Sequence, residues 1–356
     1  MSFLNKLGVI KHNVRRQVTR GVITQAVALG TRRLIIFLTP GFDGPSGGTL
    51  SIAWTYHESQ LLGDLHGAKV AICTIPGEPP LLKYTWFENS NYLLDLEGLL
   101  SCCNELDYLL IHIPEYAVNQ VADWLDSYEA KLRNIKELHL NVMVQHIDIM
   151  QGQDLNRLKR FGKVTCTTAH EAYSNAATRE ALGVSLHRLS CCNGPERYTL
   201  SRYEDKQPLL MVGHDQHPLK DKVIAEIGKA LPALKIQVIQ GLKFEEYLEV
   251  ARRAKWSLTF GEGLDSYFSD PVFCGGVSFA VYNERFFTPA FAELETVYPS
   301  WDVLRDRITT DIQRLDEPIA YKRSWRAAWD ILNDLYSVER FRANLRSFYR
   351  GEYTFP

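Results

Sequence analysis

Two acidic side chains flank a glycine-containing loop late in the sequence. Glu262 stands two positions after the run 256–260, which we expect to be a buried strand. Asp270 stands eight positions later, where we expect a short helix over 270–274. An acid at a helix start normally caps the helix, contributing about 1 kcal/mol. Two acids beside a loop whose amides point at one place can do more. One can accept hydrogen bonds from sugar hydroxyls, the other from a ribose diol, and the amides can hold phosphate.

Two other loops that follow predicted strands also carry groups suited to phosphate. In 213–222, His214 and Lys220 can reach a pyrophosphate, although a solvated turn before an amphipathic helix would look the same. In 41–48, glycines let the backbone approach a ligand closely, and the next helix offers its N–H groups to an anion. The glycines do not follow G-x-G-x-x-G and no acid stands at the ribose-binding spacing, so a nicotinamide site is not favoured.

Alternating strands and helices must position these loops. We predict strands over 34–38, 68–74, 108–113, 137–144, 163–167, 209–212, 235–240, 256–260 and 277–282. We predict helices over 49–65, 118–131, 170–182, 221–230, 244–254 and 270–274, and a helical, aromatic tail over 321–349. Repeated units of this length indicate parallel sheets with helices on both faces. Ligands of open parallel sheets bind beyond the carboxyl ends of the strands, where all three loops lie.

Length and composition limit the class of protein. The 356 residues fit two α/β domains better than one, and the net charge of −2 gives no field that would attract nucleic acid. The sequence has no run of about 18 apolar residues and no signal-peptide pattern. Seven cysteines without a C-x-x-C predict buried, reduced thiols rather than a zinc or redox site. We therefore expect a cytoplasmic protein without a nucleic-acid partner.

The N-terminus is locally basic and mixed with apolar residues. Its cations are Lys6, Lys11, Arg15, Arg16 and Arg20, followed by Arg32 and Arg33, and its apolar residues are Leu4, Val9, Ile10, Val14, Val18 and Ile23. The pattern fits an amphipathic segment in peripheral contact with an anionic membrane, and equally a solvated helical extension.

The spacing of Glu262 and Asp270 resembles the E-x7-E motif of retaining glycosyltransferases of the GT-B fold, especially family 4, with aspartate replacing the second glutamate. The pair Cys274-Gly275 resembles the cysteine–glycine pair that follows the motif in that family. Four earlier stretches match family features in the same order: the glycine pair Gly47-Gly48, the active-site histidine His146, the asparagine–glycine pair Asn193-Gly194 that opens the second domain, and the phosphate-binding stretch with Gly213 and Lys220. In that last stretch His214 replaces the expected arginine, which weakens fixed positive charge, and Lys222 can substitute in part.

The resemblance implies two doubly wound Rossmann-like domains facing across a cleft. We expect an N-terminal acceptor-binding domain over 1–192, a linker over 193–207 and a nucleotide-sugar-binding domain over 208–325. We expect the helix over 326–356 to pack back toward the first domain. The implied activity is metal-independent transfer of a sugar, with retained anomeric configuration, from a nucleotide-diphosphate sugar to a glycan or lipid-linked acceptor. The commonest context of such enzymes is assembly of surface polysaccharide.

The resemblance also implies roles for single residues. His146 would contact the sugar or acceptor, Glu262 the hydroxyls of the donor sugar, and Asp270 the ribose hydroxyls. The phosphates and leaving group would be held by Gly47, Gly48, His214, Lys220, and the amides near Tyr267, Phe268 and Ser269. No cofactor or metal is implied beyond the nucleotide sugar itself.

Two other readings stay open. A GT-B sugar-nucleotide epimerase needs no second substrate, whereas a catalytically inactive GT-B-like scaffold would bind without turnover. The histidine in place of arginine and the aspartate in place of the second glutamate keep the scaffold open. Donor hydrolysis or tight nucleotide binding separates these possibilities.

Overall fold

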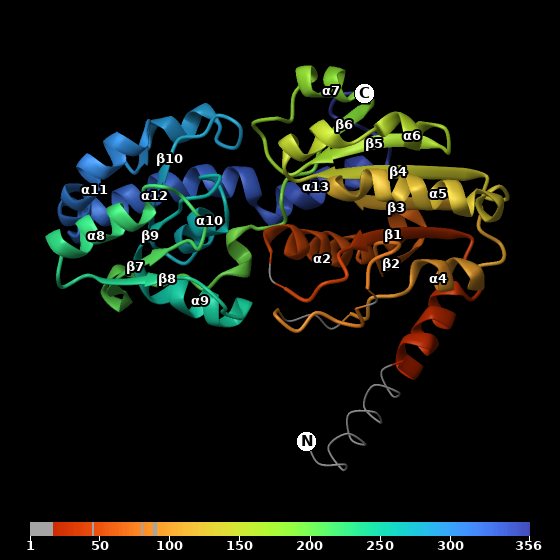
Figure 1. The fold of residues 1–356 in the computed structure, drawn as a ribbon, viewed down its shortest axis with the longest axis horizontal. Coiled ribbons are helices and arrows are strands. Elements are labelled where there is room, and N and C mark those ends of the chain that lie inside the picture. Colours follow the sequence, from red (N-terminus) through yellow and green to blue (C-terminus); the bar gives the residue numbers. More distant parts are fainter. Residues whose placement is uncertain (1–16, 45, 80, 88–90) are drawn as a thin grey trace, which may run out of the picture. The chain divides into compact units, whose positions relative to one another are not determined.

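The chain folds into two compact units, which we describe one at a time (Figure 1). The computed structural model describes residues 17–44, 46–79, 81–87 and 91–356. Unit 1 comprises Met1–Ala169, Ala176–Leu189 and Asn344–Pro356, and unit 2 comprises His170–Asn175 and Ser190–Ala343. Neither unit is therefore one continuous segment of the chain.

Unit 1 is built on a six-stranded parallel sheet. Its strands are β1 (Arg33–Thr39), β2 (Lys69–Thr74), β3 (Tyr108–Pro114), β4 (Glu137–Val144), β5 (Lys163–Thr168) and β6 (Ser185–Arg188), in the order β2-β1-β3-β4-β5-β6. The central strands read as almost continuous apolar runs, as a parallel sheet covered on both faces requires. Near the C-terminus, Phe355 forms an antiparallel bridge with Leu186, so the chain end adds to the β6 edge.

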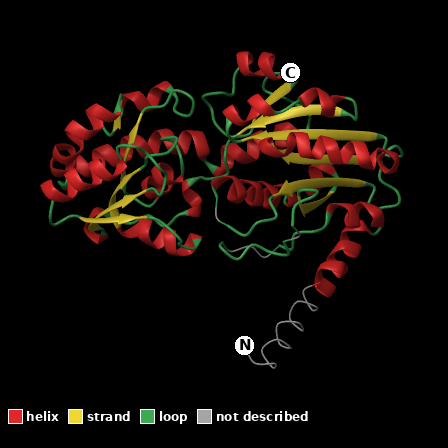
Figure 2. Ribbon diagram, in the orientation of Figure 1, coloured by secondary structure: helices red, strands yellow, loops and turns green. Residues whose placement is uncertain are grey.

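Three helices of unit 1, α2 (Gly47–Gln60), α4 (Leu96–Cys102) and α6 (Leu155–Lys159), begin at a residue whose side chain caps them. The unit also contains α3 (Gly63–His66), α5 (Val118–Leu132) and α7 (Ala176–Leu182), with a further helix over 17–28 (Figure 2). Ser46 caps α2, because its hydroxyl accepts from the Thr49 amide at 3.1 Å. Asp95 caps α4 in the same way through the Gly98 amide. Capping thus fixes where α2 begins, directly after the loop that follows β1.

Unit 2 carries a five-stranded parallel sheet. Its strands are β7 (Gln207–Val212), β8 (Lys235–Val238), β9 (Ala254–Leu258), β10 (Val277–Val281) and β11 (Val297–Tyr298), in the order β11-β10-β9-β7-β8. Its helices are α8 (Lys220–Ala230), α9 (Phe244–Arg253), α10 (Ser266–Phe273), α11 (Trp301–Leu315) and α12 (Pro318–Tyr336). Helix α13 (Val338–Tyr349) begins in unit 2 and ends in unit 1.

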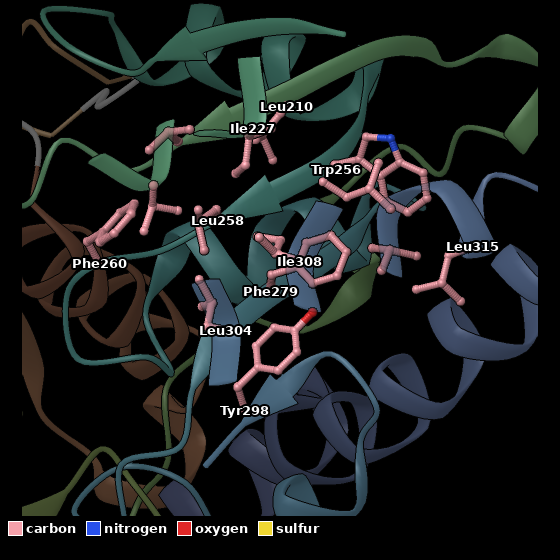
Figure 3. Close-up of a cluster of buried hydrophobic side chains, with 14 of the residues drawn as sticks. Leu210, Ile227, Trp256, Leu258, Phe260, Phe279, Tyr298, Leu304, Ile308 and Leu315 are labelled. Carbon is pink, nitrogen blue, oxygen red and sulfur yellow. The ribbon is translucent and has the colours of Figure 1, made fainter. Parts of the chain in front are cut away.

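One apolar core fixes β7, β9 and β10 of unit 2 against helices α8, α11 and α12. Figure 3 shows the cluster, in which Trp256 and Phe279 from the sheet pack with Ile308 of α11. Leu210 and Leu258 are fully buried in the same cluster, with Ile227 of α8. Because close-packed side chains resist displacement, the carboxyl ends of β7 and β9 and the loops that follow them have a well-defined position.

The predicted alternation and both parallel sheets are confirmed, and three helix boundaries differ. The predicted helix 49–65 is two helices that separate after Gln60. The helix predicted over 170–182 begins only at Ala176, because the preceding residues, including the buried Tyr173 and Ser174, belong to unit 2. The helix predicted over 270–274 begins at Ser266, with Asp265 as its cap.

Two segments of the chain belong to other units than we expected from the sequence. Residues 193–207, for which we expected a linker, lie in unit 2, where the Lys206 ammonium group donates to the carbonyls of Arg252 and Ala254 at 3.0 and 3.1 Å. Within 326–356, helix α12 ends in unit 2, and Asn344–Pro356 alone belongs to unit 1.

Two further sequence expectations concern cysteines and membranes. All seven cysteines are free thiols, four of them buried and three half-buried. Among the helices of the described ranges, we find none that combines the length and the apolar character needed to cross a bilayer.

Candidate functional site

In both units the strand order reverses at one point, and the candidate residues lie there. In unit 2, β7 lies between β8 and β9, so the loops after β7 and β9 leave the sheet side by side. In unit 1, β1 lies between β2 and β3 in the same way. Such a switch point opens a crevice at the carboxyl ends of the strands, where ligands of open α/β sheets bind.

The loop after β9 leads into the N-terminus of α10. Asp265 caps this helix: its Oδ1 accepts from the Phe268 amide at 3.1 Å, and its Oδ2 accepts from the Thr259 hydroxyl at 2.5 Å. Burial raises the pKa of Asp265 to about 7, and the nearby carboxylates of Asp215 and Glu262 also raise it, against the Thr259 hydrogen bond. The positive end of the helix dipole thus points to the same place as the end of β9.

His214 in the loop after β7 is oriented by a tyrosine from α10. Its Nδ1 lies 2.7 Å from the Tyr267 hydroxyl. Burial raises the pKa of Tyr267 to about 12, so the phenol keeps its proton and can donate to Nδ1. The neutral imidazole then carries its proton on Nε2. The residue itself is exposed, so the contact presents this N–H at the α10 N-terminus.

Lys220 is buried, not solvated, and its ammonium group binds the backbone of its own loop. Its Nζ donates to the carbonyls of Gly213 and Asp215 at 2.7 and 3.0 Å, and the residue is 7 % exposed. Burial lowers the pKa of Lys220, while Asp215 and Asp221 oppose that shift. An ammonium group has three protons. With two of them on these carbonyls, one is left for a ligand, and the loop shape depends on the other two.

Asp215 occupies the space left by two glycines at the switch point. An ideal Cβ built on Gly213 would lie 3.1 Å from Asp215 Oδ2, and one built on Gly261 would lie 3.0 Å from its Cγ. Asp265 Oδ2 lies 3.0 Å from that same Gly261 position, so the two carboxyl groups flank one small gap. Acids therefore stand beside the groups that would bind phosphate, and they offset part of the positive potential there.

Glu262 lies on a tightly held turn. The following Gly263 has φ +91°, and a Cβ there would meet Phe287 at 2.5 Å and the Val281 carbonyl at 3.0 Å. The glutamate is half-buried, and its charge reaches Asp265. Its backbone position is thus fixed at the end of β9, as expected for a group that orients a ligand.

Asp270 lies inside α10 and is not at its start. The residue is 1 % exposed, and its Oδ1 lies 2.9 to 3.1 Å from the Tyr198 hydroxyl, the Asn193 amide and the Ser269 hydroxyl. Burial raises the pKa of Asp270 to about 6, and these hydrogen bonds, together with one from Tyr247, oppose the rise. The carboxyl group is thus enclosed by protein groups.

In unit 1 the glycine pair follows β1 at the switch point, and His146 follows β4, the neighbour of β3. Helix α2 starts at Gly47, and a Cβ on Gly48 would meet the Gln145 amide oxygen at 2.4 Å. Gln145 Nε2 donates to the Gly48 carbonyl at 3.2 Å, joining the end of β4 to the start of α2. The His146 amide donates to Glu115 Oε1 at 3.1 Å. These contacts bring the glycine pair and His146, which are far apart in sequence, to one sheet edge.

Sequence reasoning missed several residues that hold these sites together. Glu115, at the end of β3, is 3 % exposed, and an acid directly after a buried strand is a usable signal. Asp265 was recognisable as a cap, since Asp265-Ser266 precedes an apolar run. Tyr198 and Tyr247 carried no local signal, because only tertiary packing brings them to Asp270.

The described ranges contain no cluster of side chains that could bind a metal ion. Groups of three or more histidine, cysteine, aspartate or glutamate side chains with suitable geometry are not found there. Asp215, Glu262 and Asp265 lie near one another, but their carboxylates are involved in capping and electrostatic contacts. The site is therefore described here by its protein groups alone.

Comparison with known proteins gives matches in structure and not in sequence. No model of a known protein family matches the chain, and no curated protein sequence matches it. Three similar solved structures are an α-glucosyltransferase in complex with UDP, a sucrose-phosphate synthase from Thermosynechococcus elongatus, and the Anabaena protein HepE in complex with UDP-glucose.

The likeness spans nearly the whole of each chain. The α-glucosyltransferase has a TM-score of 0.58 at 12% identity, covering 89% of this chain and 99% of that one. The corresponding values are 0.54, 11%, 90% and 99% for the synthase, and 0.53, 12%, 89% and 99% for HepE. At such low identity the likeness establishes the fold, and it confirms the predicted GT-B architecture.

Proposed function

We propose that this chain, which has the GT-B fold, transfers a sugar from a nucleotide-diphosphate sugar to a second substrate. The observation that carries the proposal is the junction of the loops after β7 and β9 at the N-terminus of α10. That junction combines a helix dipole, an oriented histidine and a carboxylate on a fixed turn. Two of the structural neighbours described above contain UDP or UDP-glucose, which supports a uridine nucleotide as the first to test.

The reaction leaves a nucleotide diphosphate, and the barrier falls if its developing charge is stabilised. The Ser266 and Tyr267 amides at the start of α10 and the Nε2–H of His214 would donate to this charge, whereas the Phe268 and Ser269 amides already donate to Asp265. Lys220 would donate one hydrogen bond to the diphosphate, and its other two hydrogen bonds hold the conformation of the loop. Donors held in place before the reaction need no reorganisation as charge develops, which is the source of their catalytic effect.

Glu262 would bind hydroxyls of the donor sugar and orient its ring. On unit 1, we assign His146 to the sugar or acceptor, and Gly47 and Gly48 to the donor phosphates. Glu115 and Gln145 hold these groups in place. We further propose, from the sequence resemblance, that the anomeric configuration is retained, that no metal is required, and that the product is a surface polysaccharide.

The acceptor we propose is a glycan or a lipid-linked saccharide, met at the inner face of a membrane. The helix over 17–28 exposes Val18 and Val22 at 62% and 65% and carries Arg20, and Leu29, directly after its end, is 80% exposed. This spacing forms an apolar stripe, which suits insertion among lipid headgroups. Arg32 is paired with Asp107, and Arg33 lies over the Tyr108 ring, so neither adds freely to that surface. Lys6, Lys11, Arg15 and Arg16 lie outside the described residues.

The proposal is tested by nucleotide binding. UDP, GDP, dTDP, CMP and ADP are each added in a thermal-shift assay with wild type and His214→Ala. A ligand at 100 times its dissociation constant adds about 2.7 kcal/mol of stability. We expect one diphosphate to raise the melting temperature of wild type clearly and that of the variant less. No shift with any nucleotide would contradict the proposal.

Turnover separates the transferase from its alternatives. With the matching nucleotide sugar, slow hydrolysis and faster release of nucleotide on adding an acceptor indicate a transferase. Conversion of the sugar without an acceptor indicates an epimerase, and tight binding without turnover indicates a scaffold. The acceptor panel includes glycan primers, lipid-linked saccharides in anionic vesicles, and duplex DNA. The DNA is included because one structural neighbour is an α-glucosyltransferase in complex with UDP-glucose and DNA.

A further inference from the structure

Asp270 is enclosed by hydrogen-bond donors from three different parts of unit 2. Tyr198 and Asn193 come from the segment before β7, and Ser269 precedes Asp270 in α10. Their donor atoms lie 2.9, 3.1 and 3.0 Å from Oδ1. Tyr247, from α9, also hydrogen-bonds the carboxyl group. Each carboxylate oxygen has about two acceptor positions, so the three donors at Oδ1 fill the capacity of that oxygen, and the Tyr247 hydroxyl shares its proton with the Ser266 carbonyl.

The same donors connect α10 to its surroundings. The Tyr247 hydroxyl donates to the Ser266 carbonyl at 2.7 Å, at the start of α10. Tyr198 also contacts the Asn193 side chain, so the two residues form one unit. Asp270 is therefore the common partner that holds helices α9 and α10 and the segment 193–198 together.

The segment 193–198 is also held at Gly194. A Cβ there would lie 2.7 Å from the Tyr336 carbonyl and 2.8 Å from the Val338 amide, both backbone atoms. Because these atoms cannot turn aside, the segment cannot shift toward α12 and α13. With one side fixed at Gly194 and the other at Asp270, the segment has a single position relative to α10.

We propose that Asp270 is a positioning residue of the sugar-donor site: its carboxylate fixes the N-terminus of α10, and it does not read the ribose hydroxyls of the nucleotide. This inference rests on the proposed function. Asp270 is 1 % exposed, and to accept hydrogen bonds from ribose its Oδ1 would have to release protein donors that are buried with it. The aspartate side chain, one methylene shorter than glutamate, cannot extend past them.

The first arm of the test needs no nucleotide. Hydrogen exchange is measured by mass spectrometry on the ligand-free full chain, for wild type, Asp270→Asn and Tyr198→Phe, with Glu226→Gln on the exposed face of α8 as control. Losing a buried hydrogen bond should speed exchange in 193–198 and 266–269 by about 5- to 30-fold in both variants. Exchange in β4 of unit 1 should not change. Unchanged exchange in 193–198 and 266–269 would overturn the positioning role.

The second arm compares UDP with 2′,3′-dideoxy-UDP by calorimetry. A hydrogen bond to a charged carboxylate is worth about tenfold or more in affinity, so a ribose-reading Asp270 would discriminate by at least that factor. We expect the two nucleotides to bind within about threefold of each other. Discrimination above about tenfold in wild type that disappears in Asp270→Asn would overturn the inference. If neither nucleotide binds, the uridine specificity fails, and the exchange arm still decides the positioning role.

Discussion

At the scale of single residues, the charge balance of the sugar-donor site depends on one histidine. Asp215, Glu262 and Asp265 lie close to the α10 N-terminus. The Lys220 ammonium group donates two hydrogen bonds to backbone carbonyls. His214 is an exposed side chain of the loop after β7, and Tyr267 of α10 orients its imidazole. In the proposed site, a histidine in place of arginine would weaken phosphate binding, because its positive charge is not fixed.

His214→Ala should weaken UDP binding by about tenfold, since a charge-assisted hydrogen bond to phosphate is lost. Tyr267→Phe removes only the hydroxyl that orients the ring, so its loss should be smaller, about threefold. Dissociation constants are measured by calorimetry. His57→Ala, at an exposed position of α2 in unit 1, serves as the matched control and should bind like wild type. Equal affinity in His214→Ala and wild type would remove this residue from the site.

Glu262→Gln should lower kcat/KM for the nucleotide sugar by about 10- to 100-fold and leave UDP affinity almost unchanged. The reason is that Glu262 is assigned to the sugar and not to the nucleotide. Steady-state kinetics and calorimetry on the same preparation separate the two effects. Glu226→Gln, an exposed acid of α8, is the control. A parallel loss of UDP affinity would show that Glu262 acts on the nucleotide instead.

At the scale of elements, α10 is defined by contacts at both ends. Asp265 caps its start, and Gly275 ends it with φ +88°. A Cβ on Gly275 would lie 2.2 Å from the Ser201 carbonyl oxygen. A larger residue would clash there, so the position after Cys274 requires glycine. Both ends of α10, the helix we propose to bind the diphosphate, are thus fixed by contacts with the protein.

Gly194→Ala should destabilise the fold by about 1–3 kcal/mol, because the added methyl group meets backbone atoms of Tyr336 and Val338. Gly228→Ala is the matched control. Its Cβ has only Ile236 Cδ1 at 3.7 Å as neighbour, and alanine favours the α8 helix, so stability should stay equal or rise by up to about 1 kcal/mol. Urea unfolding measures both changes. A tolerated Gly194→Ala would mean that the segment 193–198 can relax.

At the scale of the whole molecule, the two units respond to acid in opposite directions. In unit 1, burial lowers the pKa of His112, His139 and His187, and that of His139 falls to about 3. In unit 2, burial raises the pKa of Asp265 to about 7 and that of Asp270 to about 6. A lowered histidine pKa costs stability once the pH falls below the unfolded value of about 6.5. A raised aspartate pKa costs stability above the unfolded value of about 3.9, and acid relieves that cost.

Between pH 7.5 and 5, unit 1 should therefore lose stability while unit 2 gains it. Native-state hydrogen exchange, corrected for intrinsic rates, gives the opening free energy of β4 amides in unit 1 and β9 amides in unit 2. His139→Gln keeps a polar group near the Thr165 hydroxyl, 2.8 Å from the imidazole, and should reduce the acid loss in unit 1. Asp265→Asn keeps the helix cap and should flatten the trend in unit 2. Parallel trends in the two units would contradict this assignment.

Periodicity and turn chemistry were sufficient to predict the alternating elements, both parallel sheets and the loops that carry the candidate residues. These properties are local: a strand or helix is marked by the spacing of apolar side chains in its own segment. The start of α10 was misplaced because two acids, Asp265 and Asp270, compete for the cap position. Only the fold shows that Asp270 is buried among side chains from other elements.

The sequence by itself determined the class of fold, the order of its elements and the three loops at strand ends. The tertiary structure decided which side chains meet there: Tyr267 with His214, Lys220 with two carbonyls, and Asp270 with four protein donors. The physical reason is that hydrogen bonding and burial join residues far apart in the sequence, such as Asn193 and Asp270, which are 77 positions apart. No local pattern in one sequence records such a pairing, because the packing of whole elements creates it.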